Sequence, residues 1–114
     1  MSDELQQANS WYTYILLCAD GSLYTGVATD LRRRLHEHNH TAAGARYTRP
    51  RRPVALAYFE AMGSRSDACK REYEIKQLDA RQKTELILTV DAADMMAGGV
   101  PAEILDKLRA GIPV

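Results

Sequence analysis

The sequence predicts an α+β domain: a small three-stranded antiparallel sheet flanked by helices, with a helical C-terminal tail. Short aromatic and aliphatic runs at 11–18, 23–28 and 54–60 are typical of strands. Between and after these runs, capped stretches carry apolar residues at helical spacing. With 114 residues, 46% of them hydrophobic and 26% charged, the chain suits one small domain with a modest core.

Three segments are expected along the chain. Residues 1–10 are polar and acidic, unlike a signal or transit peptide, and are interpreted as a loose leader. Residues 11–88 hold the predicted sheet and its helices. Residues 89–114 are expected to form a helical extension, with a short helix stopped by the glycine pair at 98–99 and a last helix over 101–110.

The two cysteines, Cys18 and Cys69, fit reduced thiols, because nothing in the sequence resembles an export signal. Cys18 also alternates like a buried strand residue, and neither position predicts a disulfide or a nucleophile. No run approaches the ~18 consecutive apolar residues of a membrane span. We therefore expect a cytoplasmic protein without a membrane segment.

The first two predicted strands form a hairpin, and the length of its loop decides which side chains share a face. A two-residue loop at 20–21 would send Tyr14 and Tyr24 to opposite faces. A three-residue loop at 19–21, with its glycine in the left-handed region, pairs Tyr14 with Gly26 and puts both tyrosines on one face. Gly26 would then leave room beside Tyr14 for a substrate group.

The first predicted helix covers residues 31–39 and begins after Thr29 or Asp30, either of which can cap it. One stripe of this helix, at i, i+3, i+4 and i+7, contains two leucines that supply the packing. The same stripe contains Arg34 and His38, where apolar residues would cost less. This placement marks both as candidate functional residues.

Two further helices are predicted after the third strand. One runs from about residue 67 to 78, following a weak capping signal at Ser64, and it places Glu72 among apolar neighbours. The other covers residues 80–88 and is capped by Asp79. Glu72 is therefore a third polar candidate on an otherwise apolar stripe.

The net charge is zero, but residues 32–52 hold seven arginines against Glu37 alone, a local balance of +6. A neutral chain with one basic flank suggests a directed anionic partner, although a solvated arginine loop is the common alternative. The side chains expected to contact a nucleic-acid backbone are Arg46, Tyr47, Arg49, Arg51 and Arg52, with Tyr47 also available for stacking on a base. Such a patch predicts salt-sensitive binding with little sequence specificity.

His36, His38 and His40 do not predict a zinc site. Side chains two residues apart on a helix point in different directions, so the three cannot converge on one ion. Zinc also usually takes about four well-spaced ligands.

Several short motifs follow one another in a fixed order: Tyr12-Thr13-Tyr14, Tyr24-Thr25-Gly26, and residues 30–38, 44–48, 53–56 and 68–76. Together they resemble the GIY-YIG endonuclease superfamily over about two-thirds of the chain, and most of all its short, stand-alone bacterial members. The first triplet is Tyr-Thr-Tyr in place of Gly-Ile-Tyr. Val27 stands where some members carry a lysine, and no asparagine matches near Thr84.

The resemblance implies a role for five side chains. Tyr14 and Tyr24 would be the site tyrosines; either could be the base, and Tyr14 is slightly favoured. Arg34 would hold the scissile phosphate, and His38 would support proton transfer. Glu72 would be the sole protein ligand of one divalent ion, Mg²⁺ or Mn²⁺.

These groups suit phosphodiester hydrolysis, which needs an activated water, charge stabilisation on the phosphoryl oxygens and help for the leaving oxygen. The guanidinium of Arg34 is a fixed cationic fork for phosphate. A single carboxylate suits Mg²⁺, which keeps most of its own waters. A phenol with a pKa near ~10 needs nearby cations to act as a base at neutral pH, and Arg34 and the metal would supply them.

Each of the five side chains also has an ordinary structural explanation. The tyrosines could be strand aromatics, and the histidine could lie exposed at the helix end. Arg34 could pair with Asp30 or Glu37, and Glu72 with Lys76 four residues on. The catalytic interpretation therefore depends on whether all five side chains meet in space.

Three functions follow from these observations. The first is a metal-dependent endonuclease acting on nucleic acid, with DNA expected as the substrate, low sequence specificity and a role of the repair or recombination type. The second is a nucleic-acid-binding adaptor with weak or no cleavage. The third is a structural domain whose acidic C-terminal tail docks a protein partner.

Overall fold

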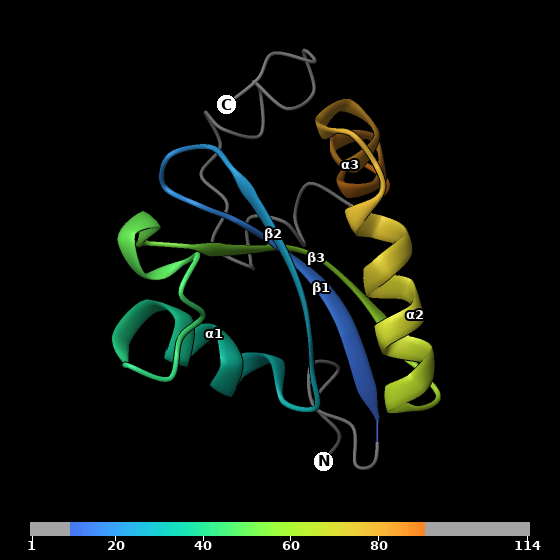
Figure 1. Ribbon diagram of the computed structural model, residues 1–114, viewed down its shortest axis with the longest axis horizontal. Helices are drawn as coiled ribbons and strands as arrows, with labels where there is room; N and C mark the ends of the chain where they lie inside the picture. Colours follow the sequence, from blue (N-terminus) through green and yellow to red (C-terminus); the bar gives the residue numbers. More distant parts are fainter. Residues whose placement is uncertain (1–9, 91–114) are drawn as a thin grey trace.

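A three-stranded antiparallel sheet forms the middle layer of the molecule, with strand order β2-β1-β3 (Figure 1). The computed structural model describes residues 10–90. In chain order its elements are β1 (Trp11–Leu17), β2 (Leu23–Ala28), α1 (Leu31–His40), η1 (Arg49–Arg51, one 3₁₀ turn), β3 (Ala55–Met62), α2 (Arg65–Lys76) and α3 (Ala80–Ile87). Helix α1 covers one face of the sheet, and α2 and α3 cover the other. The predicted α+β class is confirmed.

The predicted helices of the C-terminal extension lie outside the described residues. None of the helices within residues 10–90 has the length and apolar character needed to span a bilayer.

Alternation along β1 gives the sheet two apolar faces. Tyr12, Tyr14 and Leu16 point toward α1, and each is at most 2% exposed. Ile15 and Leu17 point the other way, into the cluster under α2 and α3. The first predicted site tyrosine therefore lies on the α1 side of the sheet.

The hairpin has the three-residue loop that puts both tyrosines on one face. Tyr14 pairs with Gly26, and Tyr24 lies two residues before Gly26 on the neighbouring strand. Gly21 has a φ of 86°, in the left-handed region that glycine adopts without steric cost. The register predicted from the odd loop length is confirmed.

Each helix begins after a residue whose side chain accepts a hydrogen bond from the backbone N–H three residues on. These caps are Asp30 for α1, Ser64 for α2 and Asp79 for α3, the last with a complete capping box. Helix α2 begins at Arg65, slightly earlier than predicted, because the helix starts directly after its capping serine.

Two polar contacts fasten α2 to the sheet. The hydroxyl of Thr13, on β1, donates to the backbone carbonyl of Ala68 at 2.9 Å in the buried interface. The guanidinium of Arg71 forms a two-pronged ion pair with Glu60 on β3, with N–O distances of 2.9 to 3.0 Å. The turn of α2 that carries Glu72 is thus fixed relative to both strands.

Candidate active site

The hydroxyl of Tyr14 has predicted site residues from β2 and α1 beside it. Its oxygen lies 2.9 Å from Nε2 of His38. The ring of Tyr24 contacts the same imidazole edge-on, with centroids 5.4 Å apart. Arg34 and Glu72 both act electrostatically on the Tyr14 hydroxyl, in opposite directions. Side chains from β2 and α1 therefore lie around one hydroxyl of β1, and the charge of Glu72 on α2 also acts on it.

Gly26 makes room for Tyr14 itself. A Cβ at Gly26 would lie 2.6 Å from Oη and 2.7 Å from Cζ of Tyr14, and 3.2 Å from a ring carbon of Tyr24. The expectation that Gly26 leaves space for a substrate group is therefore corrected. The alternation of the strand had predicted the missing side chain opposite Tyr14, but it could not show that the phenol ring lies in that space.

Tyr14 is held in its protonated form. Burial raises the pKa of its hydroxyl well above the ordinary value, and Tyr24 adds to this rise. The guanidinium of Arg34 opposes the shift in the pKa without cancelling it. Arg34 alone therefore does not turn this phenol into a base at neutral pH.

His38 lies fully buried in the helix stripe that faces the sheet. Burial, followed by the positive charges of Arg34 and Arg52, lowers the pKa of its imidazole to about 4. The ring is therefore neutral near pH 7. The alternative of an exposed histidine at the helix end is excluded by its position.

Arg34 lies beside Tyr14 but is also tied to its own helix and the following loop. Its Nη1 atom forms a 3.0 Å ion pair with Glu37 and donates to the carbonyl of Ala43 at 2.9 Å. The predicted pairing with Glu37 is therefore present. Because the side chain keeps 28% of its surface exposed, the guanidinium remains reachable from solvent.

Glu72 acts on Tyr14 from the α2 side, and it also pairs with Lys76 at 3.1 Å, as the structural alternative expected. Its side chain is 23% exposed. Within residues 10–90, no group of three or more His, Cys, Asp or Glu side chains could hold a metal ion.

His36 and His40 lie apart from this site, and their rings contact each other with centroids 4.8 Å apart. Only His38 points into the core. The three histidines thus face different surroundings on α1.

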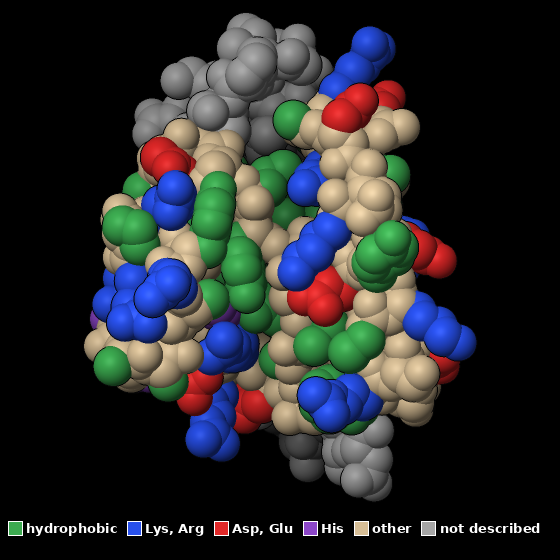
Figure 2. Space-filling view, in the orientation of Figure 1, with side chains coloured by type: hydrophobic (Ala, Val, Ile, Leu, Met, Phe, Trp, Pro, Cys, Tyr) green, Lys and Arg blue, Asp and Glu red, His purple; other side chains and the backbone are tan. Residues whose placement is uncertain are grey.

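The five side chains expected to contact nucleic acid do not play one common role. Arg46 and Arg49 are exposed, and within residues 10–90 they pair with no acidic side chain. Tyr47 is 39% exposed, and the guanidinium of Arg51 lies 3.9 Å over the centroid of its ring. Figure 2 shows Lys and Arg side chains gathered over the side of the molecule where α1 and η1 lie.

Arg52 is a structural residue of the fold. Its guanidinium donates to the backbone carbonyls of Glu37, His38 and Thr41 at the C-terminal end of α1. A cation at this end also complements the helix dipole. Arg51 is likewise engaged, since its Nε atom pairs with Asp20 at 3.0 Å. We therefore do not propose Arg52 as a nucleic-acid contact.

Two contacts to the buried histidine are not predictable from the sequence pattern. Nδ1 of His38 lies 2.9 Å from the hydroxyl of Thr48 and 3.4 Å from the backbone nitrogen of Ala45. Both residues belong to the motif at 44–48, which was predicted as part of the family pattern and of a basic loop, with no contact to His38. The small residues Gly44 and Ala45 inside that arginine-rich stretch were the available signal that the loop packs closely on something.

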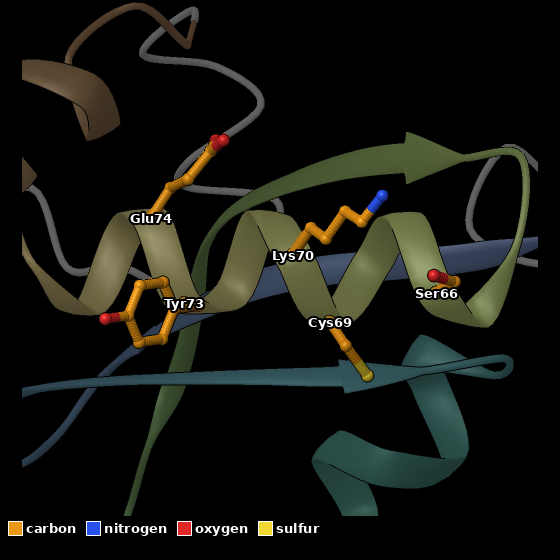
Figure 3. A pocket seen from close by; sticks show the side chains of 5 residues that line it. All are labelled: Ser66, Cys69, Lys70, Tyr73 and Glu74. Atoms are coloured by element: carbon orange, nitrogen blue, oxygen red, sulfur yellow. The ribbon is translucent and has the colours of Figure 1, made fainter.

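A surface hollow of about 630 Å³ lies along the outer side of α2 (Figure 3). Its lining side chains are Ser66, Cys69, Lys70, Tyr73 and Glu74. None of the five predicted site residues belongs to it. Because the chemical groups converge at Tyr14 and not here, we place the candidate active site at Tyr14.

A model of the GIY-YIG catalytic domain matches residues 10–85. The chain belongs to the GIY-YIG family. The resemblance seen in the ordered motifs is thereby confirmed, and the GIY-YIG domain places the chain in a nuclease family. In this domain the two triplets lie side by side on β1 and β2, with their tyrosines facing α1.

Several known proteins are similar to this chain in sequence. A UPF0213 protein of Desulfotalea psychrophila is 56% identical over 78 residues, which cover 68% of this chain and 71% of that protein. A UPF0213 protein of Staphylococcus saprophyticus is 51% identical over 76 residues, or 67% of this chain and 92% of that protein. The solution NMR structure of an E. faecalis protein superposes with a TM-score of 0.53 at 44% identity, covering 74% of this GIY-YIG chain and 88% of that one.

Proposed function

We propose that the chain is a divalent-metal-dependent endonuclease that hydrolyses phosphodiester bonds of nucleic acid, with DNA as the expected substrate. The observation that carries the proposal is that Tyr24, Arg34 and His38 lie around the hydroxyl of Tyr14, on which the charge of Glu72 also acts. A structural hairpin has no need for a neutral buried histidine, a half-buried arginine and a half-buried carboxylate around one phenol. Family membership supports the same reaction class.

Each side chain has a defined task in this proposal. Arg34 holds the scissile phosphate through its guanidinium, which is half-buried but reachable from solvent. Tyr14 and Tyr24 would orient the attacking water. Tyr14 is the favoured proton acceptor, in its ionised form, after its own proton has passed to solvent. His38 supports the proton transfer at Tyr14, since its neutral ring contacts the phenol oxygen directly.

Glu72 would hold the metal, Mg²⁺ or Mn²⁺, as its one protein ligand. When bound, the ion would supply positive charge to the phosphoryl oxygens and to the tyrosine hydroxyls. The raised pKa of Tyr14 explains why such a cation is needed in addition to Arg34. Lys76 must then share or release the Glu72 carboxylate, with which it pairs at 3.1 Å.

Substrate contact would come from the basic side of the molecule. Arg46 and Arg49 are exposed, and beside them the exposed ring of Tyr47 stacks with the half-buried guanidinium of Arg51. None of these side chains shows a pattern that reads base sequence, so the binding would follow the phosphate backbone. We further propose that residues 11–88 act as the nuclease unit in the cytoplasm, with residues 89–114 as a separate extension.

A cleavage assay tests this function. Purified protein is incubated with supercoiled, single-stranded and branched DNA, with Mg²⁺ or with a chelator. We expect cleavage only with metal, and we expect R34A to bind DNA without cutting it. R33A is the matched control, because Arg33 lies on the same helix, is 76% exposed and also pairs with Glu37. Metal-independent cleavage, or equal activity of R34A and R33A, would contradict the assignment.

The second candidate function is a nucleic-acid-binding adaptor. It is favoured by the protonated Tyr14 and by the ion pairs that already occupy Arg34 and Glu72. In the same assay an adaptor binds every DNA form without cutting, whatever the metal. Docking of a protein partner by the C-terminal tail concerns residues outside the described part of the chain.

A further inference from the structure

The loop after α1 folds back over the imidazole of His38. Nδ1 of the ring lies 2.9 Å from the Thr48 hydroxyl and 3.4 Å from the backbone nitrogen of Ala45. Nε2, on the other side of the ring, lies 2.9 Å from the hydroxyl of Tyr14. Both ring nitrogens are thus engaged, and a neutral imidazole carries its proton on only one of them.

The partner of Nδ1 decides where that proton resides. The backbone N–H of Ala45 is a donor that cannot accept, so Nδ1 must be the acceptor in this contact. The proton of the neutral ring therefore sits on Nε2. Nε2–H then donates to the oxygen of Tyr14, which is its 2.9 Å partner.

The hydroxyl of Thr48 fits the same assignment. Its other possible acceptor is the carbonyl of Ala45, 3.0 Å away. That carbonyl already accepts from the backbone N–H of Thr48 at 3.1 Å and of Arg49 at 3.2 Å. The hydroxyl has a single proton, and because Nδ1 is unprotonated when it accepts from Ala45, that proton turns from the carbonyl to Nδ1. If the hydroxyl proton pointed elsewhere, a lone pair of the Thr48 oxygen would face the lone pair of Nδ1 across 2.9 Å.

The loop that presents these donors is fixed in place. A Cβ at Gly44 would lie 2.7 Å from the carbonyl oxygen of Glu37 and 2.9 Å from the guanidinium of Arg52, so only a glycine allows this approach. Arg52 in turn bonds the carbonyls at the end of α1. Thr48 itself is fully buried.

We propose that Thr48, together with the backbone amide of Ala45, holds His38 as its Nε2–H tautomer and so makes His38 a hydrogen-bond donor to Tyr14. Thr48 is then a positioning residue of the site. The consequence for catalysis, which rests on the proposed function, is that His38 does not take the proton of Tyr14. Instead, the Tyr14 proton points away from His38, and the imidazole N–H stabilises the phenol oxygen whenever that oxygen is negatively charged.

The tautomer is directly measurable by NMR. Long-range ¹H–¹⁵N correlations of the ¹⁵N-labelled full chain at pH 7 report which ring nitrogen of each histidine carries the proton, and H38Q assigns the signals. We expect Nε2 of His38 to be protonated and Nδ1 to be unprotonated. T48V should lose the single-tautomer signature, while T48S, which keeps a hydroxyl, should retain it. A proton on Nδ1 in the wild type would overturn the proposal, as would an unchanged pattern in T48V.

This experiment is independent of nuclease activity. If the wild type shows the expected tautomer but cuts no substrate, the proposed function fails and the tautomer assignment stands. Where cleavage is measurable, we expect T48V to lower kcat at an unchanged KM, and T48S to restore it. An equal loss in T48V and T48S, with folded protein in both, would contradict the positioning role of the hydroxyl.

Discussion

The position of the Tyr14 ring depends directly on the absence of a side chain at Gly26. The phenol lies where a Cβ would be, at 2.6 Å from its oxygen, so no larger residue fits without displacing the ring. Backbone conformation does not require a glycine at position 26, because among the described glycines only Gly21 has a positive φ. Gly26 is therefore a packing requirement of the candidate site.

We expect G26A to destabilise the protein by about 1 to 3 kcal/mol, because overpacking forces the Tyr14 ring away from its rotamer and from His38. Thermal or urea unfolding measures this cost. G63A is the matched control, since a Cβ there would meet its nearest atom, on Asp67, at an ordinary 3.7 Å. Equal free energies of unfolding of G26A and G63A would show that the Tyr14 ring can move aside at no cost in stability, and would contradict the packing requirement.

His38 gives the protein a specific pH dependence. Its pKa is about 4 in the folded protein and about 6.5 when exposed, so the unfolded chain binds more protons between these values. Stability contributed by the neutral ring is fully present above pH 6.5 and is lost as pH falls toward 4. Arg34 and Arg52 act in this direction, and Glu37 opposes them.

We expect the wild type to lose on the order of 3 kcal/mol more stability than H38Q between pH 7 and pH 4. Urea unfolding at a series of pH values measures the difference, with H36Q as the control for an exposed histidine of the same helix. A parallel pH dependence of the wild type and H38Q would contradict the burial of a neutral imidazole.

Of the single residues of the candidate site, the sequence predicted the two tyrosines and did not predict Thr48. Tyr14 and Tyr24 could be placed on one face because strand alternation and loop length are local rules. Thr48 could not be found in the same way, because its contact with His38 depends on how an irregular loop folds back. A single hydroxyl in a loop rich in glycine, proline and arginine has no periodicity that points to a ring nitrogen.

At the scale of elements, α2 matters because it brings Glu72 to the sheet that carries Tyr14. The hydroxyl of Thr13 bonds the carbonyl of Ala68, and by helix geometry that same carbonyl also accepts from the N–H of residue 72. One hydrogen bond therefore links the strand of the tyrosine to the turn of the carboxylate. Thr13 is the middle residue of the first triplet, where the family pattern has isoleucine. Its hydroxyl makes a hydrogen bond to α2 that isoleucine could not make.

We expect T13V to lower the free energy of unfolding by about 1 kcal/mol, because it keeps the shape of the side chain and removes one buried hydrogen bond. Denaturant unfolding measures the loss. T84V is the matched control, since the Thr84 hydroxyl bonds a carbonyl of its own helix at 2.9 Å and links no two elements. A larger loss in T84V than in T13V would argue against the role of Thr13 as a link.

The helices were predictable because each begins at a capping residue that can be recognised from a few neighbouring positions, as at Asp30 and Asp79. The position of α2 on the sheet was not predictable. It depends on the buried hydrogen bond from Thr13 to Ala68 and on the ion pair of Arg71 with Glu60. Both are long-range contacts between residues that look like ordinary strand and helix positions. The sequence could therefore predict where Glu72 lies on its helix, but not how far it stands from Tyr14.

At the scale of the whole molecule, the chain is neutral but residues 32–52 carry a local excess of positive charge, and Figure 2 shows Lys and Arg side chains where α1 and η1 lie as well as over α2. Part of this charge serves the fold, as Arg52 does at the end of α1. Arg46 and Arg49 are exposed and remain available to an anionic partner. The composition could predict the basic flank, whereas the division between structural and available arginines required the structure.

We expect R46A/R49A to weaken DNA binding and to lower the slope of log affinity against log salt by about 2, because two phosphate contacts are lost. Fluorescence anisotropy over a range of salt concentrations measures this slope. R81A, an exposed arginine on α3 at the other face of the sheet, is the control and should leave the slope unchanged. The same slope in R46A/R49A and R81A would place the binding surface elsewhere.

The central claim is that one carboxylate on α2 completes a phosphodiesterase site around Tyr14. The most direct measurement is the rate of DNA cleavage as a function of Mg²⁺ concentration for E72Q and for E74Q. Glu74 lies on the same helix, but its side chain is 63% exposed and pairs with Arg71. We predict that E72Q binds DNA normally and loses metal-dependent cleavage, while E74Q cleaves like the wild type. Cleavage by E72Q at the rate of E74Q, over the whole Mg²⁺ range, would contradict the account.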